Sequence, residues 1–162
     1  MAVYRAPMRS RRDDVAPLAA VARALELGLC GFGGALRPPP AELAAAVVAA
    51  ERQHDVRLAR RIERFASVTA GSFAWTRDVR GQYRLGRIEG PYRYDGRDGD
   101  VTVDLVHVRA CKWLVSAVPD SDVPQAVVAT FGRGGRNFQQ THGLGVDLES
   151  LRVWNQRTEF SR

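Results

Sequence analysis

The segment from Phe73 to Tyr94, FAWTRDVRGQYRLGRIEGPYRY, decides the fold of this 162-residue chain. Two runs, SFAWTRD and QYRLGRIEG, flank a short loop at residues 79–81, a pattern typical of a β-hairpin. Phe73 and Trp75 fall on one face of the first strand because side chains alternate with period two. That face either packs into the core of a small sheet or remains available for a ligand.

Glycine and proline interrupt the second half of this segment. Gly86 and Gly90 predict a bend in the strand or the close approach of another group, and a proline then ends the strand. Tyr92 and Tyr94 therefore lie beyond the strand end, where aromatic side chains are harder to explain as core residues. With Arg93 between them, they are candidates for contact with a ligand.

The rest of the chain predicts helices around a short buried strand, followed by further strands. The expected helices cover 13–27, 41–54 and 56–66, and the last two form either one long helix or two consecutive helices. The expected strands include Leu29–Phe32 and 101–114, which follows a turn at 95–100. The segment 124–134 and the stretch 150–160 fit either helix or strand. This order predicts a single α+β domain over residues 1–162, built on a small curled sheet or barrel.

Composition and charge narrow the class of partner. The chain carries a net charge of +6 and has an isoelectric point near 10.1, which favours a polyanionic partner such as nucleic acid. No apolar run approaches the length of a membrane span, and the basic N-terminus is not followed by the apolar region of a secretory signal. We therefore expect a cytoplasmic protein without a membrane partner.

The sequence contains none of the common catalytic or metal-binding motifs. Cys30 and Cys111 are isolated and predict reduced core residues, and no HExxH or CxxC pattern is present. A Walker A motif is also missing, so nucleotide hydrolysis is not implied. We expect no metal and no cofactor, and a non-catalytic protein is favoured over an enzyme.

A glycine-rich stretch, TFGRGGRNFQQTH at 130–142, is the second candidate for ligand binding. Its glycines free the backbone to form anion-binding concavities, and its arginines can grip phosphate through two hydrogen bonds. Its phenylalanines can stack on bases, and its amide side chains can read a base edge. The residues in these roles are Arg133 and Arg136 for phosphate, Phe131 and Phe138 for stacking, and Asn137, Gln139 and Gln140 for base edges. A flexible loop without a ligand is the structural alternative.

Three motifs follow one another over residues 28–115. A short strand runs into a glycine-rich stretch at 30–36; Arg64-Phe65 precedes Gly71-Ser-Phe-Ala and then the segment from Tyr83 to Tyr94; and HVRACKWL begins at His107. Together these motifs resemble the PUA-like superfamily, in particular its EVE, YTH and ASCH branches and the N-terminal readers of modification-dependent restriction enzymes. Two departures are Ser72, where the family usually has Asp, and Phe-Gly-Gly at the end of the first strand, where readers often have Trp.

The resemblance implies a small, strongly bent β-barrel flanked by helices, with additions at 13–27 and 143–162. It also implies a module that holds a flipped, modified base of a nucleic acid in an aromatic pocket. DNA is favoured, RNA stays open, and any cleavage would need a separately encoded nuclease. On this interpretation the base pocket is formed by Phe32, Gly33, Trp75, Tyr92, Tyr94, Trp113, Asn137 and Gln139, and phosphates are bound by Arg93, Arg133 and Arg136.

Two other interpretations stay open. An ASCH-like amidohydrolase acting on a modified nucleoside would need Lys112 or Glu89 as its base. A protein-interaction module would use the alanine-rich helix at 41–54 as its contact surface.

Overall fold

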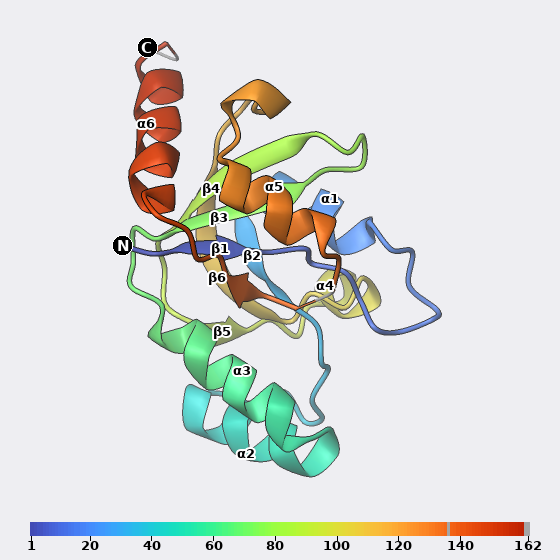
Figure 1. The fold of residues 1–162 in the computed structure, drawn as a ribbon. Coiled ribbons are helices and arrows are strands. Elements are labelled where there is room, and N and C mark those ends of the chain that lie inside the picture. The colour runs from blue at the N-terminus through green and yellow to red at the C-terminus, as the bar shows by residue number, and fades with distance from the viewer. Residues whose placement is uncertain (136, 161–162) are drawn as a thin grey trace.

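A mixed β-sheet, curled through 225° into a half-barrel, forms the centre of the molecule (Figure 1). The structure is a computed structural model that describes residues 1–135 and 137–160. The strands are β1 (Val3–Arg5), β2 (Leu29–Phe32), β3 (Phe73–Arg77), β4 (Tyr83–Ile88), β5 (Arg93–Tyr94), β6 (His107–Trp113) and β7 (Gln139–Gln140). Their order is β2-β6-β4-β3-β1-β7, and β5 pairs with β6. Only the β1–β3 pair is parallel among the strand pairs of the described residues.

Helices flank the half-barrel. They are α1 (Ala19–Leu27), α2 (Leu43–Gln53), α3 (Val56–Ser67), α4 (Asp98–Thr102), α5 (Gln125–Gly132) and α6 (Val146–Glu159). Helix α1 packs on β2, α2 packs on α3, and α5 and α6 both contact β1. Figure 1 shows α2 and α3 together at one end of the sheet and α5 and α6 at the other. Within the described part of the chain, no helix has the length and apolar composition needed to cross a lipid bilayer.

The β3–β4 hairpin forms as predicted and divides the core into two clusters. Phe73, Trp75 and Leu85 point into one cluster with Trp154 of α6. Ala74 and Ile88 point into the other cluster, which includes apolar residues of α1, α2 and α3. Strand β3 therefore has two buried faces, which explains why it begins with three apolar residues, whereas the half-buried Arg84 and Arg87 interrupt the apolar pattern of β4.

Strand β4 ends where its glycines predict a change. Gly86 lies under the Trp113 ring, and a Cβ added to Gly86 would be 2.6 Å from the ring atom Cε3. After β4 the chain bends near Gly90 and pairs with β6 again as β5. The expected close approach at Gly86 is thus confirmed, and its cause is an indole ring that needs the space.

Several predicted elements are confirmed. Strand β2 has the predicted bounds, and the helical region expected over 41–66 consists of two helices, α2 and α3. The helix expected at 13–27 begins only at Ala19 but ends as predicted at Gly28, which adopts the left-handed conformation. The two segments whose pattern fits either helix or strand, 124–134 and 150–160, lie largely within the helices α5 and α6.

The predicted long strand over 101–114 is wrong in its first half. Residues 98–102 form α4, whose first turn carries Asp98 and Asp100, and acidic side chains are favourable at a helix N-terminus. Asp104 then adopts a positive φ of 59°, which breaks any strand at that point. The strand begins only at His107. The predicted barrel is a half-barrel, and the sheet path ends at β2 on one side and at the two-residue β7 on the other.

Candidate functional site

A cavity of about 620 Å³ opens where β2 ends, and we name it the Phe32 pocket. The segment that follows β2 forms one wall, the beginning of α3 a second, and the N-terminal segment at 9–14 a third. Phe32, Leu58 and Phe138 supply its apolar surface, and Asp104 supplies a carboxylate. The pocket therefore joins elements that are far apart in the sequence.

The apolar surface of the Phe32 pocket belongs to an aromatic cluster. The Phe32 ring lies 5.1 Å from the Phe65 ring, in an edge-to-face arrangement. The Phe138 ring stacks on Tyr4 at 4.8 Å and meets Phe65 edge-to-face at 4.9 Å. The centroids of Phe32 and Phe138 are 6.4 Å apart. Such packing fixes the two rings that line the pocket and so presents rigid aromatic surface to a planar ligand.

Asp104 is the buried acidic group of the Phe32 pocket, and it is 5% exposed. Its Oδ1 accepts a hydrogen bond from the backbone N–H of Gly34 at 3.0 Å, and its Oδ2 accepts one from the Ser10 hydroxyl at 2.5 Å. Each carboxylate oxygen can accept more than one hydrogen bond, so Asp104 retains capacity for an N–H donor of a ligand. Its positive φ is a sparsely populated conformation, and such conformations cluster at functional sites.

Ring side chains hold the backbone of the segment at 33–36. His107 Nε2 lies 2.8 Å from the Gly34 carbonyl oxygen, and His54 Nε2 lies 2.8 Å from that of Ala35. The Tyr94 hydroxyl accepts a hydrogen bond from the N–H of Leu36 and donates one to its carbonyl. These contacts, with that of Asp104, preorganise the wall of the pocket.

The tautomer of His107 follows from its two partners. A carbonyl oxygen only accepts, so Nε2 carries the proton and donates to Gly34. Nδ1 then accepts from the Tyr92 hydroxyl at 2.8 Å. Burial lowers the pKa of His107 to about 4, although its bond to the Gly34 carbonyl opposes that shift. His107 is therefore neutral at pH 7, and burial also raises the pKa of Tyr92.

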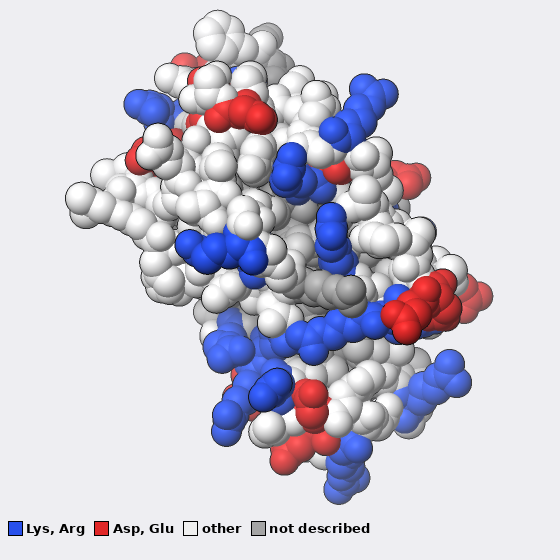
Figure 2. Space-filling model, turned by 45° about the vertical axis from the view of Figure 1, so that its right-hand side comes forward, with Lys and Arg blue, Asp and Glu red and all other residues white. Residues whose placement is uncertain are grey.

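Arginines surround the mouth of the Phe32 pocket. They are Arg9, Arg11, Arg12, Arg37 and Arg61, and the acidic residues are Asp14, Asp55 and Asp104. Asp14 pairs with Arg12 at 2.6 Å, and Asp55 caps α3 by accepting from the Leu58 N–H. Figure 2 shows Lys and Arg side chains across the middle and lower part of one face of the molecule, with fewer acidic side chains among them. Positive charge therefore predominates at this mouth.

Arg61 lies closest to the aromatic surface. Its guanidinium carbon is 5.8 Å from the centroid of the Phe32 ring, within the range of a cation–π contact. Burial, followed by the charge of Arg11, lowers the pKa of Arg61. An anionic ligand would relieve this repulsion between the two arginines.

The structure brings together three of the predicted base-pocket residues. Phe32, Gly33 and Asn137 line the Phe32 pocket, and Asn137 accepts a hydrogen bond from Arg11. Tyr92 and Tyr94 do not line the pocket but support its wall through His107 and Leu36.

The two predicted tryptophans lie elsewhere. Trp75 is fully buried, and its indole N–H donates to the Ser150 hydroxyl at 3.1 Å. Trp113 packs over Gly86 and donates to the Leu29 carbonyl. Neither ring is available to the Phe32 pocket, because strand alternation turns Trp75 into the core and the absence of a side chain at Gly86 makes room for Trp113.

Three of the predicted polar residues also lie outside the Phe32 pocket. Arg93 pairs with the buried carboxylate of Asp95 at 2.8 Å, and Gln139 accepts a hydrogen bond from Arg5. Arg133 is exposed at the end of α5. None of these three lines the Phe32 pocket. Arg136 lies outside the described residues.

Asp104 was missed as a site residue, because it fell within a predicted strand. Arg61 belongs to the arginine-rich face of a helix, a pattern that fits either a solvated surface or a track that binds phosphates. The acidic turn before Val101 is the one sequence signal that would have placed a helix, and hence a chain reversal, ahead of Asp104. Lys112 and Glu89, the candidate bases of an amidohydrolase, are exposed and do not line the Phe32 pocket.

In residues 1–135 and 137–160, no three side chains of His, Cys, Asp or Glu lie close enough together to bind a metal ion. The described site offers aromatic surface, one buried carboxylate and several guanidinium groups. No protein-family model and no curated protein matches this chain.

Proposed function

We propose that this chain is a non-catalytic nucleic-acid-binding module that holds an extruded base in the Phe32 pocket. The observation that carries this proposal is the position of the Asp104 carboxylate beside two fixed aromatic rings, inside a rim of arginines. A planar ligand with N–H donors and an attached anion matches all three features. A nucleotide is such a ligand.

The dimensions and energies are compatible with a base. Ligand pockets usually enclose about 300–1,000 Å³, and the Phe32 pocket encloses about 620 Å³. Extruding a base from a duplex costs a few kcal/mol. Stacking on an aromatic ring offsets about 1–3 kcal/mol of this cost, and arginine–phosphate contacts contribute further.

Asp104 favours bases that present hydrogen-bond donors. A carboxylate accepts from the amino group of cytosine, and the amino groups of adenine and guanine offer the same chemistry. Thymine presents fewer donors and is the least suited base. A modified base is supported by the apolar surface of Phe32 and Leu58, on which an added alkyl group would be buried.

The strongly curled half-barrel with flanking helices is compatible with a PUA-like domain. We extend the proposal to a PUA-like reader of modified DNA, which would act with a separately encoded nuclease in a defence setting. RNA is the alternative ligand, and a contact to its 2′-hydroxyl would distinguish it. The amidohydrolase alternative has less support, because Lys112 and Glu89 lie outside the pocket.

The test is a binding panel with the full chain. Labelled DNA and RNA oligonucleotides, each plain or with one modified base, are titrated and followed by fluorescence anisotropy at several salt concentrations. We expect binding that depends on the base and weakens steeply with salt, with a log–log slope of about 0.7 per phosphate contacted on a single strand. Binding to no oligonucleotide, or an affinity independent of salt, would overturn the proposal.

A further inference from the structure

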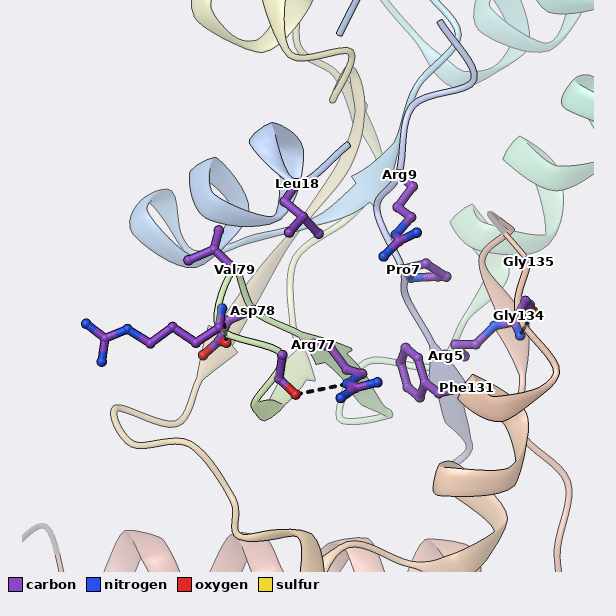
Figure 3. A pocket seen from close by; sticks show the side chains of 12 residues that line it. Arg5, Pro7, Arg9, Leu18, Arg77, Asp78, Val79, Phe131, Gly134 and Gly135 are labelled. Carbon is purple, nitrogen blue, oxygen red and sulfur yellow. Dashed lines mark hydrogen bonds between the residues drawn. The ribbon is translucent and has the colours of Figure 1, made fainter. Parts of the chain in front are cut away.

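A second cavity, of about 480 Å³, lies between the N-terminal segment, the β3–β4 hairpin and the loop after α5 (Figure 3). We name it the Arg5 pocket. Arginines reach it from two directions: Arg5 and Arg9 come from the N-terminal segment, and Arg77 and Arg80 come from the hairpin. Figure 3 shows the side chains of Arg5, Arg9 and Arg77 around this opening.

Arg5 is a buried guanidinium whose hydrogen bonds go to neutral acceptors. It is 4% exposed, and it donates to the carbonyls of Thr130 and Gly134, at 2.7 and 2.6 Å, and to the side-chain oxygen of Gln139 at 3.0 Å. Its Nε has no hydrogen-bond partner among the described residues. Burial, followed by the charge of Arg133, lowers the pKa of Arg5. A buried charge is costly unless it is paired, so a nearby anion would stabilise this group.

The acidic residue that lines the Arg5 pocket, Asp78, is already engaged. It accepts hydrogen bonds from the backbone N–H groups of Arg80 and Gln82 within the hairpin turn, and it forms an ion pair with Arg84. In the described part of the chain, no carboxylate forms an ion pair with any of the four arginines of this pocket. The pocket is therefore a concentration of uncompensated positive charge.

The loop after α5 runs beside this charge through two glycines. Gly134 and Gly135 have positive φ angles of 74° and 108°, a conformation that L side chains rarely adopt. A Cβ added to Gly135 would lie 3.0 Å from Arg5 Nη2, and nothing lies within 4 Å of the corresponding position on Gly134. The glycines therefore leave space next to the guanidinium of Arg5, which is itself buried.

Arg9 connects the two cavities, because it lines both the Arg5 pocket and the Phe32 pocket. The residue before it, Met8, is buried and has a positive φ of 53°. This conformation is unusual for a bulky residue and signals a constrained turn. The N-terminal segment thus places an exposed arginine on the boundary between the two pockets.

We propose that the Arg5 pocket is a phosphate-binding site, and that it takes a backbone phosphate of the strand whose base occupies the Phe32 pocket. The second half of this proposal rests on the proposed function, and the first half does not. Guanidinium groups bind phosphate through paired hydrogen bonds, and four arginines line this pocket. The bound strand would pass from one pocket to the other across Arg9.

The test uses the double variant Arg77→Ala/Arg80→Ala, because both side chains are exposed. Arg152→Ala, an exposed arginine on α6, is the control. The affinity and salt slope are measured for a single-stranded oligonucleotide. We expect the double variant to bind at least about tenfold more weakly, with a slope lower by about 0.7 for each phosphate that is no longer bound. Its preference among bases should equal that of the wild type.

A second measurement separates the two proposals. Inorganic phosphate is titrated into the isotopically labelled protein, and the amide signals of Gly134 and Gly135 are followed by NMR. Shifts in the wild type that disappear in the double variant support the phosphate site, even if no oligonucleotide binds and the proposed function fails. Conversely, if the wild type binds oligonucleotides and the double variant keeps the same affinity and slope, the phosphate site is overturned while the proposed function stands.

Discussion

Asp104 accepts a hydrogen bond from the backbone N–H of Gly34 at 3.0 Å, which ties the chain reversal before β6 to the segment that follows β2. These residues lie seventy positions apart in the sequence. The contact holds a carboxylate in the same pocket as the Phe32 ring. The proposed recognition of a base depends on this arrangement, since either group alone is common in proteins.

Substitution of Asp104 tests the role of its charge. In Asp104→Asn the side-chain oxygen can still accept from Gly34, so the fold should be retained while one acceptor becomes a donor. We expect binding of the preferred oligonucleotide to weaken by about 1–3 kcal/mol, the value of a good base contact. Anisotropy titrations of this variant and of Asp13→Asn, an exposed aspartate outside the pocket, give the comparison. Equal losses in both variants would show that only net charge matters.

Gly33 tests the fit between the pocket wall and Asp104. A Cβ at Gly33 would lie 2.2 Å from Asp104 Oδ2, so Gly33→Ala must displace the carboxylate. We expect a loss of about 1–3 kcal/mol in stability from this overpacking, together with weaker binding. Gly132→Ala is the matched control, because nothing lies within 4 Å of its Cβ position at the end of α5. Thermal unfolding of both variants decides: a Gly33→Ala protein as stable as Gly132→Ala would contradict the close approach of Gly33 to Asp104.

Phe138 tests the stacking surface with little risk to the core, because it is only partly buried. Phe138→Leu keeps an apolar side chain but removes the ring that lines the pocket. We expect about tenfold weaker binding, since stacking contributes about 1–3 kcal/mol per base. Phe160→Leu, at an exposed position just after α6, should bind as the wild type does. An unchanged affinity of Phe138→Leu would remove Phe138 from the site.

Trp75 is expected from the sequence to line the base pocket, but the structure places it in the core. Its indole N–H donates to Ser150 inside the core. Trp75→Phe should therefore lower the free energy of unfolding by about 1 kcal/mol through the missing hydrogen bond, beyond any packing defect. Its affinity for oligonucleotides, measured on the folded protein, should be unchanged. A selective loss of affinity without loss of stability would restore Trp75 as a ligand-contacting residue.

His107 makes stability depend on pH. Its pKa in the folded protein is about 4, below its ordinary value of 6.5, so between these values the unfolded state binds more protons. Stability is therefore lost as the pH falls from 6.5 to 4, by up to about 3 kcal/mol. Urea unfolding at several pH values should show this decrease in the wild type. His107→Gln, which can still donate to the Gly34 carbonyl, should show a shallower decrease, and an identical profile would exclude His107 as the cause.

Local patterns in the sequence were sufficient for much of the fold. Alternation in the hairpin predicted that Phe73 and Trp75 share a face, and Gly28 predicted the end of α1. These features depend on neighbouring residues, which the sequence displays directly. Strand β1 was not predicted, because three residues carry too little pattern.

The site was harder to predict because it depends on contacts between distant segments. Aromatic residues beyond the hairpin suggested an aromatic pocket for a base, yet Tyr92 and Tyr94 support the pocket wall from behind. Nothing in the local sequence distinguishes a ring that lines a cavity from one that holds its wall. Asp104 was hidden for a related reason, since its left-handed conformation follows from the way α4 meets β6.

The central claim is that a nucleic-acid base enters the Phe32 pocket. The most direct test follows the backbone amide signals of Gly33, Gly34 and Ala35 by NMR while the tightest-binding oligonucleotide of the panel is added. We predict that these signals shift in proportion to binding, together with the signal of Asp104. Binding that leaves all four signals unchanged, with shifts confined to another surface, would contradict this claim.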